Sequence, residues 1–326
     1  MRDASPLSGT PGLSLRDVME CEPLSGGTYN TLFRVVLRDG RRWVIKLPPS
    51  DGAGTTMAYE YDLLHGEAVF YAAAAPLGLP IPVVLHAEVE GDPGIVSCLV
   101  MTERPGTPWH LVDGDLRADE RRALREELGG IAARLHGVSG DAFGYPAQPF
   151  GAPSHSWREA FTGMLEGALD DAVRYGARLP RSVETVRAAL ASAAYALDEV
   201  DRPALVHFDL WQGNVLLTGE PGARRIGGVI DGERMFWGDP LAEFVSLALF
   251  GDIEQDRDFL AGYAAAGGEA RFTGPARLRL ALYRCYLYLI MLVEAVPRRY
   301  GPAELDRTWR TAGKHFAAAV DEAGRG

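Results

Sequence analysis

The chain has 326 residues, of which 47% are hydrophobic and 24% are charged, and this composition excludes a disordered, collagen-like or coiled-coil protein. Its formal net charge is -11 and its basic residues form no run, which disfavours nonspecific binding to nucleic acid and favours a small-molecule partner. The three cysteines form no CxxC pair, so a disulfide framework and a structural zinc site are both disfavoured, and we expect a reducing, cytoplasmic environment.

The first third of the chain predicts mainly strands. Residues 1–12 are polar and rich in Ser, Gly and Pro, which indicates a loose tail without a secretion signal at the start of a lead-in segment 1–20. Apolar and polar residues alternate over 23–47 on either side of an Asp-Gly dipeptide, the pattern of two antiparallel strands joined by a hairpin turn. Helical periodicity over 56–75 ends at a proline and a glycine, and the segments 81–90 and 94–103 predict two more strands.

The rest of the chain changes to helical patterns. Helical periodicity is found over 116–136, 157–175, 183–200 and 278–296. Short strand-like pieces interrupt these helices between 204 and 230. The most apolar stretch, 280–293, contains an arginine and is shorter than the roughly 20 residues that a membrane-spanning helix needs, so it predicts a buried helix and no membrane partner. A β-rich first third and an α-rich remainder predict an α+β protein of two lobes.

The strongest chemical signal is the segment LVHFDLWQGNVLL, in which His207, Asp209 and Asn214 have the spacing HxDxxxxN between short apolar strands. Seventeen residues after Asn214, a second apolar strand ends at Asp231, where a metal-binding acid is expected. Phosphoryl transfer needs an aligned hydroxyl and positive charge around the phosphates. We therefore expect Asp209 to accept the hydrogen bond of an acceptor hydroxyl, and Asn214 and Asp231 to hold Mg²⁺. The alternative is that Asp209 and Asn214 only cap a turn.

The segment PLSGGTYNTLFRVVL places Ser25, Gly26, Gly27 and Thr28 in a turn between strands. Because glycine has no Cβ atom, backbone N–H groups in such a turn can approach phosphate oxygens closely. We therefore expect these four residues to bind nucleotide phosphates, and an ordinary hairpin turn is the alternative. The chain has no GxxxxGK[ST] sequence, so this turn is not a P-loop.

Lys46 is one of two lysines in the chain and ends the strand WVIK. A lysine at such a position can reach from the sheet to the α- and β-phosphates of a nucleotide. On the following helix, Glu67 is the first candidate to hold Lys46 in place and Glu60 is the second. The alternative, a solvated surface lysine, is disfavoured because the strand-end lysine, the glycine turn and the two later aspartates occur in the order that phosphoryl transfer needs.

Together these residues resemble the aminoglycoside phosphotransferase-like family, small-molecule kinases with a two-lobed protein-kinase-like fold, over nearly the whole chain from about residue 20. The resemblance implies a lead-in segment 1–20, an N-terminal nucleotide-binding lobe 21–104 and a C-terminal catalytic and acceptor-binding lobe 105–326. It also implies ATP or GTP, with Mg²⁺, as the phosphate donor. By position it assigns a phosphate-anchoring pair (Lys46 and Glu67), hinge residues whose backbone would meet a purine ring (Thr102 and Arg104), and two residues that support the catalytic loop (His207 and Asp239).

Three residues depart from the family pattern. Phe208 stands where glycine is common, Gly232 stands where an aromatic residue often follows the metal-binding aspartate, and Glu243 stands where aspartate is usual. These departures separate the chain from the best-known aminoglycoside enzymes and leave the acceptor open. The segment HFDLWQGN is also similar to the Asp-Leu-Trp-x-Gly-Asn motif of fructosamine kinases, so a sugar amine or another metabolite is an alternative acceptor.

The segment after Asp231 and the late apolar helix contain candidates for the acceptor pocket, namely Glu233, Trp237, Tyr283 and Tyr286. Packing is an equally good account of these side chains. The net charge and the acidic residues at 252, 254, 256 and 294 indicate a hydroxylated, cationic acceptor that is attracted over a long range. The alternative is that these acids only keep the protein soluble.

The leading hypothesis is an ATP- or GTP-dependent kinase that phosphorylates a hydroxyl of a small molecule, with antibiotics as the first acceptor class. A metabolite kinase of the fructosamine or amino-sugar type is the second. A catalytically inactive kinase-fold binding protein is disfavoured because Lys46, Asp209, Asn214 and Asp231 are all present. A protein kinase is disfavoured because no Ala-Pro-Glu segment follows Asp231. The choice between ATP and GTP and the oligomeric state stay open.

Overall fold

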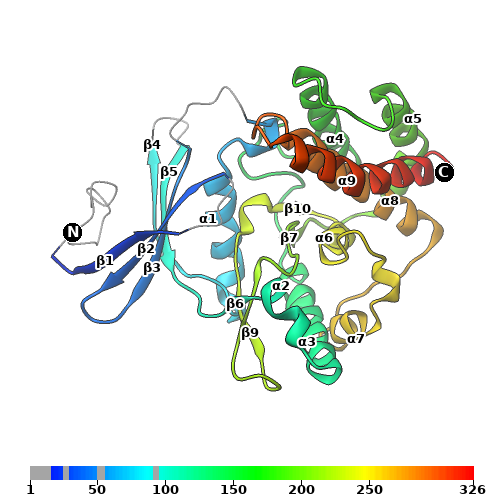
Figure 1. Ribbon diagram of the computed structural model, residues 1–326. Coiled ribbons are helices and arrows are strands. Elements are labelled where there is room, and N and C mark those ends of the chain that lie inside the picture. Colours follow the sequence, from blue (N-terminus) through cyan, green and yellow to red (C-terminus); the bar gives the residue numbers. More distant parts are fainter. Residues whose placement is uncertain (1–15, 25–28, 50–55, 91–94) are drawn as a thin grey trace.

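The computed structural model of the protein describes residues 16–24, 29–49, 56–90 and 95–326. It confirms the predicted α+β architecture, in which an antiparallel sheet forms the N-terminal part and helices form most of the C-terminal part (Figure 1). The sheet has the strand order β1-β2-β3-β5-β4. Its strands are β1 (Val18–Pro23), β2 (Thr31–Leu37), β3 (Arg42–Leu47), β4 (Val84–Glu90) and β5 (Ile95–Thr102).

The hairpin predicted over 23–47 is formed by β2 and β3, which pair in antiparallel register. Gly40 turns the chain with a φ of 85°, a left-handed conformation that glycine adopts without strain. Strand β1 begins at Val18, within the last residues of the predicted lead-in segment 1–20, and pairs with β2. Pairing with a neighbouring strand orders these residues, and a local residue pattern does not reveal such pairing.

Helix α1 (Leu63–Ala74) packs against β4 and β5 and corresponds to the helix predicted over 56–75. It begins later than predicted because Asp62 has a φ of 48°, and the Asp62 carboxylate accepts a hydrogen bond from the N–H of His65 as the N-cap. The preceding 3-10 turn, Ala58–Glu60, packs against α4 of the helical part. Helix α1 therefore lies between the sheet and the helical part, as Figure 1 shows.

The helical part contains every helix that the periodicity predicts. Its helices are α2 (Trp109–Val112), α3 (Ala118–His136), α4 (Trp157–Arg174), α5 (Val183–Ala193), α6 (Glu243–Leu247), α7 (Arg257–Ala265), α8 (Gly274–Glu294) and α9 (Pro302–Ala323). Its short strands are β6 (Thr107–Pro108), β7 (Ala204–Val206), β8 (Val215–Thr218), β9 (Arg225–Val229) and β10 (Phe236–Gly238). The most apolar stretch lies in α8, a buried helix between α4 and α9, and no described helix is long and apolar enough to cross a membrane.

The chain passes from the sheet to the helical part just after β5. There the guanidinium of Arg104 donates two hydrogen bonds, of 3.0 and 2.8 Å, to the carbonyl oxygen of Gly227 in β9. Gly106 has a φ of 132°, and a Cβ atom at this position would lie 2.8 Å from the carbonyl oxygen of Leu217. Only glycine fits here, so the connection runs directly against β8 and β9.

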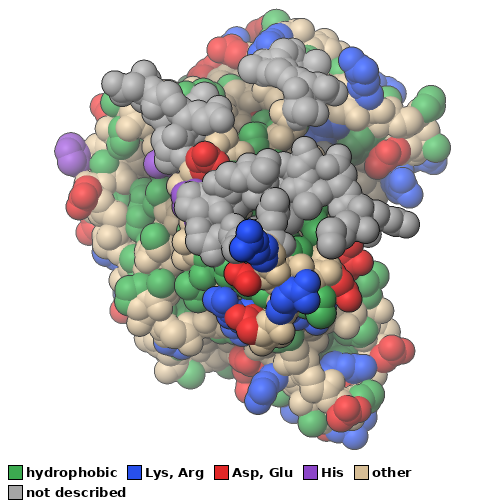
Figure 2. All heavy atoms as spheres, turned by 90° about the vertical axis from the view of Figure 1, so that its left-hand side faces the viewer, with side chains coloured by type: hydrophobic (Ala, Val, Ile, Leu, Met, Phe, Trp, Pro, Cys, Tyr) green, Lys and Arg blue, Asp and Glu red, His purple; other side chains and the backbone are tan. Residues whose placement is uncertain are grey.

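One apolar core extends from α1 and the inner side of β5 through the helical part. A smaller core lies on the other side of the sheet, and its members are Val35, Leu37, Trp43, Ile45, Cys98 and Val100. Figure 2 views the molecule from the sheet end, where basic and acidic side chains are interleaved. The sheet and its turns contain such ion pairs, for example Arg41 with Asp39 and Arg42 with Glu103.

Candidate functional site

A cavity of about 570 Å³ lies between the sheet and the helical part. Apolar side chains from both parts line one region of it, including Leu32, Val44, Met101, Leu216 and Ile230. Charged and polar side chains line the other region, and they include most of the residues that the sequence singles out, namely Lys46, Glu67, Asn214, Asp231 and Glu233. The cavity therefore has an apolar compartment next to an ionic one, as a nucleoside attached to phosphates would require.

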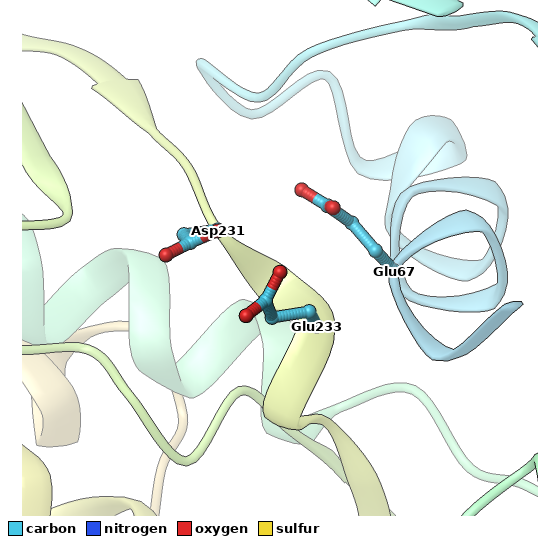
Figure 3. A group of neighbouring side chains, drawn as sticks. All are labelled: Glu67, Asp231 and Glu233. Atoms are coloured by element: carbon cyan, nitrogen blue, oxygen red, sulfur yellow. The ribbon is translucent and has the colours of Figure 1, made fainter. Parts of the chain in front are cut away.

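Lys46 lies at the centre of an acidic cluster. Its Nζ atom is 2.7 Å from Oε2 of Glu67, 2.6 Å from Oδ1 of Asp231 and 3.5 Å from Oε2 of Glu233. Figure 3 shows Glu67 on α1 facing Asp231 and Glu233, which follow β9. Burial by itself would lower the pKa of Lys46, but the carboxylates raise it well above its ordinary value, so the ammonium stays charged. Glu60, the second candidate partner, instead pairs with Arg298 at 2.6 Å.

The oxygen atoms around Asp231 fit a magnesium ion. Both Asp231 and Asn214 line the cavity, and Nδ2 of Asn214 donates hydrogen bonds to the backbone oxygen and Oδ2 of Asp209. The amide oxygen of Asn214 is thereby left for a cation. Carboxylate oxygens of Glu67, Asp231 and Glu233 lie within 4.8 Å of one another. A set of carboxylate and amide oxygens is the donor set that Mg²⁺ prefers.

Glu233 belongs to this acidic cluster and lines the cavity, and its place in the acceptor pocket stays a prediction. Its Oε2 accepts a 2.8 Å hydrogen bond from Nδ2 of Asn30 on the sheet side. Burial raises the pKa of Glu233 to about 8, with Asp231 adding to the effect and Lys46 opposing it. The sequence signal that could have placed Glu233 is its spacing, since it lies two residues after Asp231 in the short 3-10 turn Gly232–Arg234.

The catalytic loop is organised around a buried histidine. Nε2 of His207 donates to the carbonyl oxygen of Ile230 at 2.9 Å, and Nδ1 of His207 accepts the N–H of Asp209 at 3.2 Å. Burial lowers the pKa of His207, which favours the neutral ring that this pair of hydrogen bonds requires. His207 therefore connects the strand end before Asp231 to the loop that carries Asp209.

Glu243, rather than Asp239, holds the backbone of this loop. The buried Glu243 carboxylate accepts the N–H groups of His207 and Phe208 at 2.7 and 3.0 Å. The prediction that Asp239 supports the catalytic loop is wrong, because its carboxylate accepts from the N–H of Leu241, Nε of Arg279 and the hydroxyl of Tyr283. Asp239 caps the turn before α6 and faces α8, whereas Glu243 lies on α6 directly behind the loop.

We expect Glu243→Ala to destabilise the protein and to slow turnover. The variant leaves two buried N–H groups without acceptors, which costs about 3 kcal/mol of unfolding free energy, and the loop then holds Asp209 less tightly. Urea denaturation and steady-state turnover measure the two effects. Glu254→Ala, which removes only an exposed pair with Arg277, is the control. A Glu243→Ala protein with wild-type stability and turnover would contradict the assignment.

Asp209 lies on the helical side of the site with Arg234 beside it. Nε of Arg234 is 3.9 Å from Oδ2 of Asp209, and Nη2 of Arg234 is 3.1 Å from Oε2 of Glu294. Burial raises the pKa of Asp209 to about 7, and Arg234 acts in the opposite direction. The sequence reasoning did not include Arg234, although it is the one basic residue in the segment DGERMFWGD.

Three predicted pocket residues lie in the core or pack against it. Tyr283 and Tyr286 are fully buried in α8, where the Tyr283 hydroxyl contacts Trp157 and Asp239 and the Tyr286 hydroxyl contacts Tyr145. Trp237 is half-buried in β10, and its ring lies where a Cβ atom of Gly140 would be. None of the three lines the cavity. Their polar atoms and rings are used in packing, which the apolar sequence context equally allowed.

The acids at 252, 254 and 256 lie away from the cavity, near α7 and α8. Asp252 and Asp256 accept N–H groups at the starts of short helical segments, and Glu254 pairs with Arg277. They therefore stabilise local structure, and the prediction that they attract the acceptor is not supported by their position. Of the four acids, only Glu294 lies near Asp209, through Arg234.

The hinge residues Thr102 and Arg104 both line the apolar region of the cavity. The N–H of Thr102 donates to the carbonyl oxygen of Val83 at 2.9 Å, so it is occupied within the sheet. The segment Ser25–Thr28 lies outside the described residues, and its phosphate-binding role stays a prediction. The neighbouring Leu24 and Tyr29 line the cavity, so the described chain enters and leaves that segment at the site.

Comparison with protein families and solved structures supports this architecture. A model of a family described as "Phosphotransferase enzyme family" matches residues 20–281, whereas comparison with curated protein sequences gave no match. A candidate fructosamine-3-kinase from Thermobifida fusca is 21% identical with a TM-score of 0.68, over 95% of this chain and 94% of that chain. A candidate aminoglycoside phosphotransferase from Ralstonia eutropha is 16% identical with a TM-score of 0.65, over 95% of each chain. The GDP complex of aminoglycoside 2'-phosphotransferase-IIIa is 18% identical with a TM-score of 0.61, over 96% of each chain.

Proposed function

Because the chain belongs to the phosphotransferase enzyme family, we propose that it is a kinase that transfers the γ-phosphoryl group of ATP or GTP to a hydroxyl of a small molecule. The observation that carries this proposal is one cavity lined by a buried lysine, held by Glu67 and Asp231, and by Asn214, whose side chain donates a hydrogen bond to Asp209 of the catalytic loop. A nucleotide-binding protein without activity has no chemical need for all of these groups.

The apolar compartment fits a purine base. Leu32 and Val44 of the sheet and Leu216 of the helical part line it, so a flat ring there would be covered on both faces. We propose that the base meets the hinge at the backbone of Thr102 and Arg104, through groups other than the N–H of Thr102, which is bonded to Val83. Lys46 would then contact the α- and β-phosphates, since it lines the same cavity as the hinge residues and its ammonium is next to Asp231. The GDP complex of a structurally similar phosphotransferase is consistent with nucleotide use.

We propose that Asp231 and Asn214, with Glu233 beside them, hold Mg²⁺, which when bound neutralises phosphate charge. The residues themselves are already arranged for this. Nζ of Lys46, on β3, is 2.6 Å from Oδ1 of Asp231, and this ion pair fixes the position of the carboxylate. Burial by itself would raise the pKa of Asp231, but Lys46 holds it below its ordinary value, so the carboxylate is ionised. An ionised, fixed carboxylate is what a divalent cation requires.

Asp209 would accept the hydrogen bond of the acceptor hydroxyl and receive its proton during transfer. Asn214 donates to Oδ2 of Asp209 at 3.1 Å, and this contact orients the carboxylate. Arg234 opposes the effect of burial on its pKa and so favours the ionised form that can accept a hydrogen bond. A raised pKa suits a proton acceptor, because such a group holds the proton once it has been transferred.

For the acceptor we propose a hydroxylated, amine-bearing natural product, with an antibiotic as the first class. The chain has a net charge of -11, which favours a cationic acceptor. A metabolite kinase of the fructosamine type is the second candidate, favoured by Trp211 in the DLWQGN segment. The Trp211 ring stacks on His110 at 5.2 Å and lines the cavity, where an aromatic face can cover a sugar.

A nucleotide-consumption screen tests the proposal. We expect release of ADP or GDP to require Mg²⁺ and one acceptor class among aminoglycosides, macrolides, nucleoside antibiotics and fructosamines. The KM of the charged acceptor should rise with added salt, because ions screen attraction beyond about 10 Å at 0.1 M ionic strength. A neutral competitor is the control, since its KM should not change. An uncharged or anionic acceptor with a salt-independent KM would overturn the acceptor class while leaving the kinase proposal intact.

A further inference from the structure

One face of α1 points three side chains at the site. Glu67, Phe70 and Tyr71 are three and four residues apart, the spacing that places side chains on the same side of a helix. Glu67 pairs with Lys46, and the hydroxyl of Tyr71 accepts the N–H of Asp231 at 3.0 Å. Phe70 is fully buried between them and the catalytic loop, and neither the charge cluster nor the proposed transfer step uses it.

The ring of Phe70 contacts the catalytic loop and the turn after Asp231 at the same time. Its centroid lies 5.0 Å from that of the His207 ring, and the two planes meet at 83°, an edge-to-face contact. On its other side the ring faces the backbone of Gly232. A Cβ atom built on Gly232 would lie 2.4 Å from Cδ1 and 2.8 Å from Cγ of Phe70, so any side chain at 232 would have to enter the space of this ring.

The glycine at 232 is explained by this ring and not by the backbone. Gly232 does not have a positive φ, and it begins a short 3-10 turn that any residue can adopt. No atom other than those of Phe70 appears among its three nearest neighbours. The ring of Phe70 and a side chain at position 232 would therefore compete for the same space. This space holds one aromatic ring, which could come from residue 70 or from residue 232.

We propose that Phe70 is a positioning residue, whose ring fills this shared space from α1 and fixes the turn at Asp231 and the ring of His207 relative to the Lys46–Glu67 pair. The contacts of His207 explain why this matters. The two ring nitrogens of His207 bind the carbonyl oxygen of Ile230 and the N–H of Asp209. A shift of the His207 ring would therefore move both the strand end before Asp231 and the loop that carries Asp209. The catalytic consequence rests on the proposed kinase function, but the ring placement does not.

A ring swap tests the proposal. Phe70→Ala empties the space and Gly232→Phe overfills it, so each should lower kcat on the order of tenfold or more, because small displacements of reacting groups are costly. The double variant F70A/G232F returns one ring to the same space from the other backbone position. We expect its kcat to recover to within about threefold of wild type, with the KM for the nucleotide changing less than kcat in all three variants.

A smaller substitution at position 232, Gly232→Ala, tests the same proposal in case the variants with a phenylalanine at this position do not fold. Gly232→Ala should lower kcat when Phe70 is present, because its methyl group meets the ring, and should have no further effect in the Phe70→Ala background. Phe316→Ala is the matched control, since Phe316 is equally buried in α9, away from the site. It should lower the melting temperature and leave kcat unchanged. If the effects of the substitutions at 70 and 232 simply add, the shared-space proposal is wrong.

NMR of the histidine side chains gives a readout that does not depend on activity. The ring of Phe70 should shift the His207 resonances, so Phe70→Ala should move them, F70A/G232F should move them back, and Phe316→Ala should leave them in place. If the wild type consumed no nucleotide with any acceptor, the kinase proposal would fail and these shifts would still decide the ring placement. His207 resonances that are unchanged by Phe70→Ala would overturn the inference.

Discussion

Asp209→Ala is expected to lower turnover by about 10²-fold or more, the usual range for loss of a general base, while the nucleotide affinity stays within about threefold of wild type. The Asp209 carboxylate is 3.1 Å from Nδ2 of Asn214, and in the proposed mechanism it would accept the hydrogen bond of the acceptor hydroxyl. Asn214 also donates to the backbone oxygen of Asp209 at 2.8 Å, and this hydrogen bond survives the substitution. The magnesium-side geometry should therefore persist, and the loss should appear in kcat.

Asp209→Asn separates charge from shape in the same experiment. It keeps the volume and one oxygen but cannot take a proton, so its turnover should be as low as that of Asp209→Ala. Calorimetry with the magnesium–nucleotide complex and single-turnover kinetics measure binding and chemistry separately. If either variant kept activity within threefold of wild type, Asp209 would not be the residue that receives the acceptor proton.

Asp231→Asn is expected to have the second large effect, a loss of magnesium-dependent turnover on the order of 10²- to 10³-fold. The substitution removes the negative charge of the carboxylate that pairs with Lys46 at 2.6 Å and would hold the cation. Lys46 keeps its contact with Glu67 at 2.7 Å, so the lysine itself should stay in place. The effect should therefore be seen as weaker binding of the magnesium–nucleotide complex, with a smaller change for the nucleotide without metal.

Asn214→Ala is the companion variant for the metal side. It removes a neutral oxygen donor rather than a charge, so its loss of turnover should be less complete, and higher Mg²⁺ concentrations should recover part of it. Calorimetry over a magnesium series makes the comparison. Metal-dependent binding that is unaffected in Asp231→Asn would mean that the segment after β9 has been misassigned.

The sequence by itself determined the architecture and the chemistry-bearing segments. Period-two and helical patterns over 23–47, 157–175 and 278–296 report which face of each element is buried, and that burial is a local property of the residue order. The HxDxxxxN loop and the strand ending at Asp231 could be recognised for a related reason. Both place polar side chains directly after apolar strands, and the spacing along one loop fixes which of them can meet.

Tertiary packing decided which neighbours each of these side chains has. From the sequence, Glu67 and Glu60 were both candidates for Lys46, because both lie shortly after it. The N-cap at Asp62 starts α1 late and turns Glu67 toward Lys46, whereas Glu60 lies in the preceding turn and meets Arg298. The start of α1 sets the direction in which Glu67 points, and Arg298, from a distant segment, pairs with Glu60. Neither of these can be read from the few residues around the two glutamates.

The same reason explains the wrong assignments. Tyr283 and Tyr286 could line a pocket or fill a core by sequence alone, and only the packing of α8 against α4 buries them. Asp239 and Glu243 lie four residues apart, on either side of the 3-10 turn Pro240–Ala242, and one carboxylate faces α8 while the other faces the loop. At position 232, the space for a side chain is taken by the ring of Phe70 in α1, which is 162 positions away along the chain. Local order selects residues with the right chemistry, and contacts between distant segments decide which of them act together.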